Sequence, residues 1–104
     1  ICKNIMPISP QSEEFFSKKN KLVYSNFKKK PNIKSFINLI KKGIIPRPHY
    51  ALSILLAAKQ ASDLGYKKIK IIELGCYNFD GLVDLENYAK DIQKFIKIEL
   101  EIYG

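Results

Sequence analysis

Apolar residues recur at helical spacing in three stretches of the chain, which we expect to form helices. These stretches are residues 33–42, 48–64 and 82–95. Asn32 is a residue type that caps helix starts, and Gly43 is one that ends them. Pro48 suits the first turn of the second helix, and Gly65 suits its end. The pattern therefore predicts three helices with separate boundaries.

Two shorter stretches have the pattern of β-strands. Residues 68–74 are almost continuously apolar at their centre and rich in β-branched side chains, which is typical of a parallel strand covered on both faces. Residues 96–104 alternate apolar and charged positions, which indicates a strand with one more exposed face. The order strand, helix, strand predicts a β-α-β unit, whose right-handed crossover makes the two strands parallel. We therefore expect a fold of the α/β class.

The third expected helix, residues 82–95, has an apolar stripe and a polar face. The stripe consists of Leu85, Tyr88, Ala89, Ile92 and Phe95. The polar face, which we expect to lie outside, consists of Asp84, Glu86, Lys90, Asp91 and Lys94. Asp80 can cap this helix. Helical spacing separates Asp80, Asp84 and Glu86, so we interpret them as acids that favour the positive start of the helix rather than as a metal site.

The N-terminal part of the chain is rich in lysine and less clearly patterned. Ser12 can cap a short helix there. Residues 18–30 contain too few apolar positions to decide between helix and strand, and the lysines at residues 28–30 are expected to form a solvated face. We therefore divide the chain into a basic N-terminal helical segment, residues 1–45, and a second unit, residues 46–104.

The charge balance bears on the class of partner. The 104-residue chain carries 18 lysines and arginines against 10 acidic residues, a net charge of +8. Arg47 is the single arginine, whereas proteins that read nucleic acids usually rely on arginine forks. An AT-rich genome also produces an excess of lysine, isoleucine and asparagine. The charge permits weak attraction to polyanions, and a nucleic-acid partner is the less favoured alternative.

Composition disfavours several other classes. No apolar run approaches the roughly 20 residues of a membrane span, so we expect no membrane partner. The two cysteines, Cys2 and Cys76, form no disulfide framework, which favours a reduced, cytoplasmic protein. The single histidine, His49, disfavours a zinc site built from histidine and cysteine, so we expect no metal.

Both ends of the chain suggest a piece of a longer protein. It begins with Ile1 rather than methionine and ends at Gly104, directly after the second strand pattern. Two parallel strands alone do not make a covered sheet. We therefore expect further strands to follow in the complete protein.

The segment between the first strand and the third helix holds the candidate chemistry. It reads "IIELGCYNFDG", residues 71–81, with glycines only at Gly75 and Gly81. Dinucleotide-binding loops need the spacing G-x-G-x-x-G, and no glycine fills the central position here. A Walker loop is excluded because no Gly-Lys-Ser/Thr follows. From these residues alone, a plain structural turn and a cofactor loop are about equally supported.

The same residues resemble the first motif of class I S-adenosylmethionine-dependent methyltransferases. That motif has an acidic residue at the end of the first strand and a glycine two residues later, which Glu73 and Gly75 match. Gly81 matches the last glycine of the longer form of the turn. The preceding "RPHYALSILLAAKQASDLGYKKIKIIELG" resembles the lead-in helix and first strand of a bacterial methyltransferase-like subgroup. The resemblance covers residues 47–104, and residues 1–45 show none.

The resemblance implies a Rossmann-like parallel sheet, of which this chain holds the first β-α-β unit after N-terminal helices, and S-adenosylmethionine as the cofactor. It implies that Glu73 shapes the loop or meets the amino group of the cofactor through water. The backbone of Gly75, Cys76 and Tyr77 would line the methionine part of the cofactor. Gly81 would let the third helix begin close to the ligand.

The residues just before the second helix would lie at the rim of the same pocket. They are Arg47, His49 and Tyr50. Histidine is a residue type that commonly transfers protons, so proton transfer is one hypothesis for His49, and a capping or surface role is the alternative. The implied function is methyl transfer to an acceptor that the sequence does not identify. Acceptor-binding and catalytic residues are expected beyond residue 104, so we expect this chain alone to be inactive.

Two rival interpretations remain open. A basic helical arm interleaved with aromatic residues can bind the backbone of RNA or DNA. The aromatic residues in question are Phe15, Phe16, Tyr24, Phe27 and Phe36. The same side chains also fit the core of the N-terminal helices. The other rival is a non-catalytic interaction module with a degenerate Rossmann half.

Overall fold

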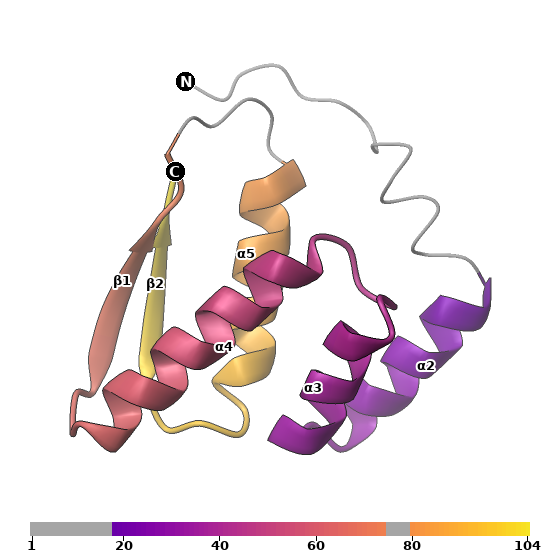
Figure 1. The fold of residues 1–104 in the computed structure, drawn as a ribbon, viewed down its shortest axis with the longest axis horizontal. Coiled ribbons are helices and arrows are strands. Elements are labelled where there is room, and N and C mark those ends of the chain that lie inside the picture. Colours follow the sequence, from indigo (N-terminus) through magenta and orange to yellow (C-terminus); the bar gives the residue numbers. More distant parts are fainter. Residues whose placement is uncertain (1–17, 75–79) are drawn as a thin grey trace.

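The computed structural model describes residues 18–74 and 80–104 of the chain. The elements there are α2 (Lys18–Lys29), α3 (Ile33–Lys41), α4 (Pro48–Asp63), β1 (Lys68–Ile72), α5 (Asp80–Ile92) and β2 (Glu99–Tyr103). Within these residues the fold is mixed α/β, as predicted, with four helices and a two-stranded sheet (Figure 1). None of the described helices is both long and apolar enough to cross a membrane. The expected helix after Ser12 lies outside the described residues.

β1 and β2 pair in parallel, which confirms the predicted order of strand, helix and strand. The register runs from Lys68 opposite Glu99 to Ile72 opposite Tyr103. Glu73 N donates a hydrogen bond to Tyr103 O at 2.9 Å, one residue beyond the end of β1. The backbone of Glu73 is therefore still fixed by the sheet.

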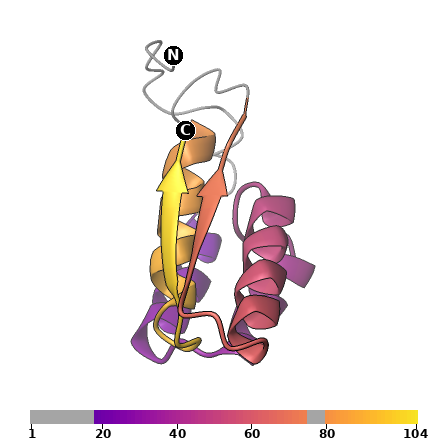
Figure 2. The same cartoon turned by 90° about the vertical axis from the view of Figure 1, so that its left-hand side faces the viewer.

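Described helices cover one face of this sheet. α4 and α5 lie on the same side of the two strands, and the other side is open in Figure 2. Ile69 and Ile71 are half-buried, whereas Lys68, Lys70 and Ile72 are exposed. The expectation that the first strand is covered on both faces is wrong within the described residues. The reason is that side chains alternate between the two faces of a strand, so Lys68 and Lys70 both lie on the face that the described helices leave uncovered.

The start and stop signals of α3 and α4 act as predicted. Asn32 Oδ1 accepts a hydrogen bond from Ser35 N at 2.8 Å and so caps α3. Gly43 and Gly65 follow the two helices with φ of +64° and +93°, a region that glycine occupies without steric cost. Pro48 is the first residue of α4.

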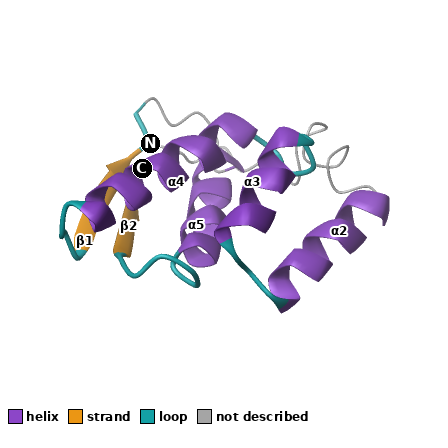
Figure 3. Cartoon of the chain, turned by 60° about the horizontal axis from the view of Figure 1, so that its bottom comes forward, coloured by secondary structure: helices purple, strands orange, loops and turns teal. Residues whose placement is uncertain are grey.

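Residues 18–30, which the sequence left undecided, contain α2, one of the helices drawn in purple in Figure 3. Phe27 is buried, and Val23 and Tyr24 are half-buried. Val23 and Tyr24 precede Phe27 by four and three residues, so both lie on the same side of the helix as Phe27. That apolar face is about one turn long, so contacts with other elements, rather than the local pattern, make the helix evident.

An aromatic cluster joins the N-terminal helices to the rest of the core. The ring centroids of Phe27 and Phe36 are 5.6 Å apart, and Phe36 lies 6.1 Å from Tyr88 and 5.8 Å from Phe95. Phe27 and Phe36 are therefore core residues, as one of the two interpretations of these aromatics predicts. Side chains from both sides of residue 45 share this cluster, so the packing does not mark a separation there. The domain boundary at residue 45 stays a prediction.

Two carboxylates of α5, Asp84 and Asp91, are buried, which corrects the expectation that both lie outside. Their exposed fractions are 7% and 1%. They are two helical turns apart, with Tyr88 between them on the same face. Asp91 Oδ2 accepts a hydrogen bond from the hydroxyl of Tyr24 on α2 at 2.5 Å. Partners from other segments offset part of the cost of burying these charges.

Removing the hydroxyl of Tyr24 tests this link between α2 and α5. Tyr24→Phe is expected to lower the free energy of unfolding by about 1–2 kcal/mol, measured by urea unfolding. The variant leaves Asp91 with two half-exposed lysines, Lys28 and Lys94, at 3.9 and 4.0 Å, which are weak partners. Tyr66→Phe, at an exposed tyrosine, is the control and should change stability by less than about 0.5 kcal/mol. Equal losses in the two variants would contradict the link.

Candidate functional site

Three elements meet beside the C-terminal end of β1: that strand, the start of α4 and the first turns of α5. Hydrogen bonds and close contacts join five residues there. We call them the strand-end cluster: Arg47, Tyr50, Glu73, Gly81 and Asp84. The end of the sheet thus receives side chains from segments that are far apart in the sequence.

Glu73 is held between Tyr50 and Gly81. The hydroxyl of Tyr50 donates to Glu73 Oε2 at 2.7 Å. A Cβ atom at Gly81 would lie 2.6 Å from the same oxygen and 3.3 Å from Tyr50 Cε2. The hydrogen bond to Glu73, together with burial, raises the pKa of Tyr50, so this hydroxyl stays a donor at neutral pH. The orientation of the Glu73 carboxylate therefore depends on the Tyr50 hydroxyl and on the absence of a side chain at Gly81.

Arg47 connects the start of α4 with α5. Its Nη1 donates to Asp84 Oδ2 at 2.6 Å, and the two side chains are 19% and 10% exposed. Arg47 has φ +47° and ψ +60°, a left-handed conformation that costs free energy in a residue other than glycine. The hydroxyl of Tyr88 donates to the carbonyl oxygen of Pro46, one residue earlier. Two contacts with α5 therefore hold the turn before α4.

Burying the ion pair of Arg47 and Asp84 costs free energy. Burial raises the pKa of Asp84 above its ordinary value of 3.8, and the guanidinium of Arg47 offsets only part of this rise. The charges of Asp80 and Glu73 raise it further. The Coulomb attraction of the pair therefore does not fully recover the loss of hydration.

A cavity of about 490 Å³ opens between α4 and β1, beside Glu73. Tyr50, Ser53, Ile71 and Glu73 are among the residues that line it. Glu73 Oε1 is buried, and none of the described residues donates a hydrogen bond to it. A buried carboxylate oxygen without a donor is costly. The strand-end cluster therefore offers an acceptor to a hydrogen-bond donor such as an amine, a hydroxyl or water.

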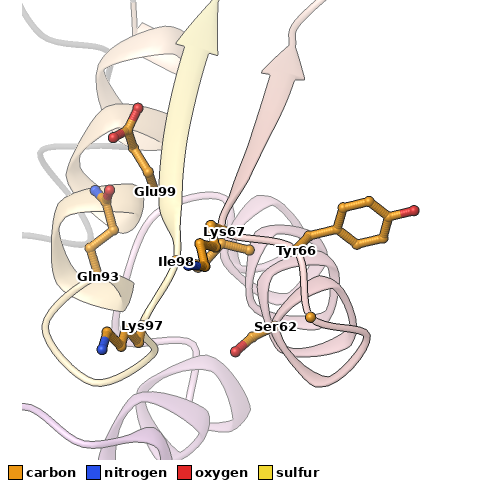
Figure 4. A pocket seen from close by; sticks show the side chains of 8 residues that line it. Ser62, Tyr66, Lys67, Gln93, Lys97, Ile98 and Glu99 are labelled. Atoms are coloured by element: carbon orange, nitrogen blue, oxygen red, sulfur yellow. The ribbon is translucent and has the colours of Figure 1, made fainter.

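A larger cavity, about 670 Å³, lies at the opposite end of the strands. Figure 4 shows its lining, in which Lys97 and Tyr66 point in opposite directions. The amide of Gln93 is engaged with Ala89 O and Leu100 N. Because its polar groups do not converge, this cavity lacks the arrangement that fixes a small ligand. The strand-end cluster is the better candidate.

The structure brings together four of the residues that the sequence predicts for a site. Glu73 and Gly81 are in contact, Tyr50 bonds Glu73, and Arg47 precedes α4 in the same cluster. His49 is exposed, and its ring centroid lies 4.7 Å from that of Tyr50 in an edge-on arrangement. His49 is therefore a surface neighbour of the cluster, and its proton-transfer role gains no support from hydrogen bonding.

The remaining predicted cofactor residues, Gly75, Cys76 and Tyr77, lie outside the described residues. Asp80, the candidate cap, is in the first turn of α5. In the part of the chain that the structure describes, no group of three histidine, cysteine, aspartate or glutamate residues is arranged to hold a metal ion.

Two features of the polar arrangement differ from the expectations. Asp84 is buried rather than outward, and Tyr50, which is expected at the pocket rim, donates a hydrogen bond to Glu73. A signal for Asp84 exists, because Asp84, Tyr88 and Asp91 recur at the spacing of one helix face. Polar residues at the spacing of a buried face require partners. No comparable local signal points from Tyr50 to Glu73.

Comparisons with known proteins assign no family to the chain. No protein-family model matches it, and neither a curated protein nor a solved structure shows significant similarity. Function is therefore inferred from the geometry of the strand-end cluster and from the residue pattern of residues 71–81.

The raised pKa of Asp84 predicts the sign of a pH dependence. The native state keeps the Asp84 proton to higher pH than the unfolded chain does. The contribution of this group to the free energy of unfolding therefore falls as pH rises from 3.8 through the native pKa. The free energy of unfolding of the wild type minus that of Asp84→Asn should decrease over this range in urea titrations. Asp63→Asn, at an exposed aspartate, should show no such decrease. An increase for Asp84→Asn would contradict the dominance of burial.

Proposed function

We propose that this chain is the cofactor-binding first half of a class I S-adenosylmethionine-dependent methyltransferase with a Rossmann-like sheet. The contact of Glu73 with Gly81 at the C-terminal end of β1 is the observation that supports this most. Open α/β sheets bind ligands outside the carboxyl ends of their strands. An acidic residue, a glycine and the start of α5 converge at that end.

The strand-end cluster fits the amino group of this cofactor. Tyr50 engages Glu73 Oε2, which leaves the buried Oε1 as the acceptor for a ligand. In this proposal Glu73 Oε1 accepts a hydrogen bond from the cofactor's ammonium group or from a water bound to it. Gly81 keeps side-chain atoms away from the start of α5, where backbone N–H groups without helical partners can face the ligand.

S-adenosylmethionine supplies a methyl group on a sulfonium, ready for transfer to a nucleophile. The contribution of this chain is to bind and orient, and rate then comes from proximity to the acceptor. The proposal includes a cytoplasmic location and the absence of activity in this chain alone.

Gly81→Ala separates cofactor binding from folding. Alanine in place of a helical glycine normally stabilises by about 0.5–1 kcal/mol, but here its Cβ would displace the Glu73 carboxylate. We expect binding of S-adenosylmethionine and of S-adenosylhomocysteine to weaken at least about tenfold, roughly 1.4 kcal/mol. The gain from alanine in a helix and the loss of the Tyr50–Glu73 bond are of similar size, so the free energy of unfolding should change by less than about 1 kcal/mol. Isothermal titration calorimetry of the full-length protein measures the affinities.

Two glutamate variants complete this test. Glu73→Gln removes the charged acceptor at similar size and should weaken binding as Gly81→Ala does. Glu86→Gln makes the same change at an exposed position of α5 and should leave the affinity unchanged. A wild-type protein that binds neither S-adenosylmethionine nor its demethylated product would overturn the proposal.

The basic surface of α2 and α3 favours a second candidate function, binding of nucleic-acid backbones. Neither helix contains an acidic residue, and the lysines at residues 28–30 are exposed. Replacing these three lysines by alanine should weaken binding of single-stranded RNA and lower the slope of log affinity against log salt by about 2. Fluorescence anisotropy at several salt concentrations measures both. Affinity that is indifferent to salt and to these lysines would remove this candidate.

A further inference from the structure

The net positive charge of the chain is confined to α2, α3 and the residues that flank them. Residues 18–42 contain nine lysines and no acidic residue, whereas the other described residues contain eight basic and eight acidic ones. All nine lysines are exposed, and only Lys28 pairs with a described carboxylate, that of Asp91 at 3.9 Å. An AT-rich genome raises the number of lysines along a chain but does not separate them from acidic residues. This surface is therefore suited to a polyanion.

The basic surface lies away from the sheet. α2 and α3 are on the side of α4 and α5 opposite to the two strands (Figure 1, Figure 3). Strands that extend a sheet are added at its edges, so they would join on the other side of these helices. α3 packs against α4, and the ring of Phe36 lies 6.1 Å from that of Tyr88 on α5. The basic surface and the strand-end cluster therefore belong to one packed body.

A cavity of about 390 Å³ forms a groove on α3 within this surface. Lys34, Asn38 and Lys41 are among the described residues that line it. Their spacing places them on one side of the helix, with the two lysines about 10 Å apart along its axis. A stacked nucleic-acid strand has one phosphate roughly every 3.4 Å, so the groove spans about three phosphates. The amide of Asn38 adds N–H donors between the two ammonium groups.

The residue types of this surface suit phosphates rather than bases. Lysine binds a phosphate as a point charge, whereas arginine forks usually read base edges, and residues 18–42 contain no arginine. Phe27 and Phe36 are buried and Tyr24 is half-buried, so the described part of these helices offers no aromatic platform on which bases stack. We therefore expect binding that is independent of base sequence.

The groove on α3 lies close to the strand-end cluster along the chain. Lys41, the last residue of α3, is six residues before Arg47, which limits the distance between their Cα atoms to about 22 Å. In Figure 1 the connection from α3 leads directly to the start of α4, beside α5. A strand held on α3 therefore reaches the strand-end cluster within about seven nucleotides, at roughly 3.4 Å each.

We propose that the methyl acceptor is a nucleic acid, which α2 and α3 hold by its phosphates while a nearby nucleotide lies at the strand-end cluster. This inference rests on the methyltransferase function proposed above and adds acceptor contacts within this chain. A nitrogen or oxygen of the nucleotide attacks the methyl carbon of S-adenosylmethionine. The new bond forms as the bond from that carbon to sulfur breaks, the electron pair of the broken bond stays on sulfur, and the proton of the nucleophile passes to water.

Single-stranded RNA of mixed sequence is the binding probe, titrated into the full-length protein with S-adenosylhomocysteine present. Lys34→Ala combined with Lys41→Ala should weaken binding at least about fivefold and lower the slope of log affinity against log salt by about 1.4. Lys90→Ala combined with Lys97→Ala removes two exposed lysines elsewhere and should change the slope by less than about 0.5. Fluorescence anisotropy at several salt concentrations measures both. Equal slopes in the two double variants would contradict binding in the groove on α3.

Transfer of a labelled methyl group tests the acceptor role separately. Label from S-adenosylmethionine should enter RNA or duplex DNA, and the double variant at residues 34 and 41 should raise KM for the nucleic acid at least about fivefold with kcat unchanged. The affinity for S-adenosylmethionine, measured by calorimetry, should be equal in the two double variants.

The outcomes separate this inference from the proposed function. A protein that binds S-adenosylmethionine but labels neither nucleic acid would overturn the acceptor assignment alone. Binding of phosphatidylserine vesicles in preference to RNA would do the same, because it would assign the basic surface to a membrane. A protein that binds no S-adenosylmethionine would overturn the proposed function and the acceptor assignment together.

Discussion

Polar side chains on the buried face of α5 require partners from other parts of the chain, and the rest of the structure depends on those bonds. Asp84 accepts a hydrogen bond from Arg47 at the start of α4. Tyr88 donates one to a backbone carbonyl of the turn before α4. Asp91 accepts one from the hydroxyl of Tyr24 on α2. A buried charge or hydroxyl without its partner costs free energy, so this face of α5 fixes both α2 and the start of α4.

The strand-end cluster is a consequence of this arrangement. The turn before α4 contains Arg47 in a left-handed conformation, and its bonds to α5 offset the cost of that backbone. With the turn fixed, α4 begins where Tyr50 reaches Glu73, and Gly81 leaves the space that the carboxylate occupies. One oxygen of Glu73 accepts the hydrogen bond from Tyr50, and the other is buried and accepts none from the described residues.

Local rules predict much of the fold. Asn32, Gly43, Pro48 and Gly65 mark the limits of α3 and α4 because caps and breakers act within a few residues. The parallel pairing of the strands follows from the order of elements. α2 could not be predicted, because its apolar face is short and is buried by contacts with helices that follow it in the sequence.

The sequence likewise predicts some residues of the candidate site and not the contacts between them. Glu73 and Gly81 lie at the end of a strand and the start of the next helix, so a sequence motif can point to both. The bond from Tyr50 to Glu73 spans 23 residues, and that from Arg47 to Asp84 spans 37. Pairs at such separations are set by packing, which no local pattern encodes. The burial of Asp84 was missed because a charged residue is normally assigned to a solvent face.

The contact between Tyr50 and Gly81 tests most directly whether α5 sets the geometry of the strand-end cluster. The measurement is the nuclear Overhauser effect between the Tyr50 ring protons and the Gly81 Hα protons, in the wild type and in Tyr88→Phe. We predict a strong cross-peak in the wild type and a weaker one in the variant, because the turn before α4 loses a bond to α5. A cross-peak of equal intensity in both proteins, or none in the wild type, would contradict it.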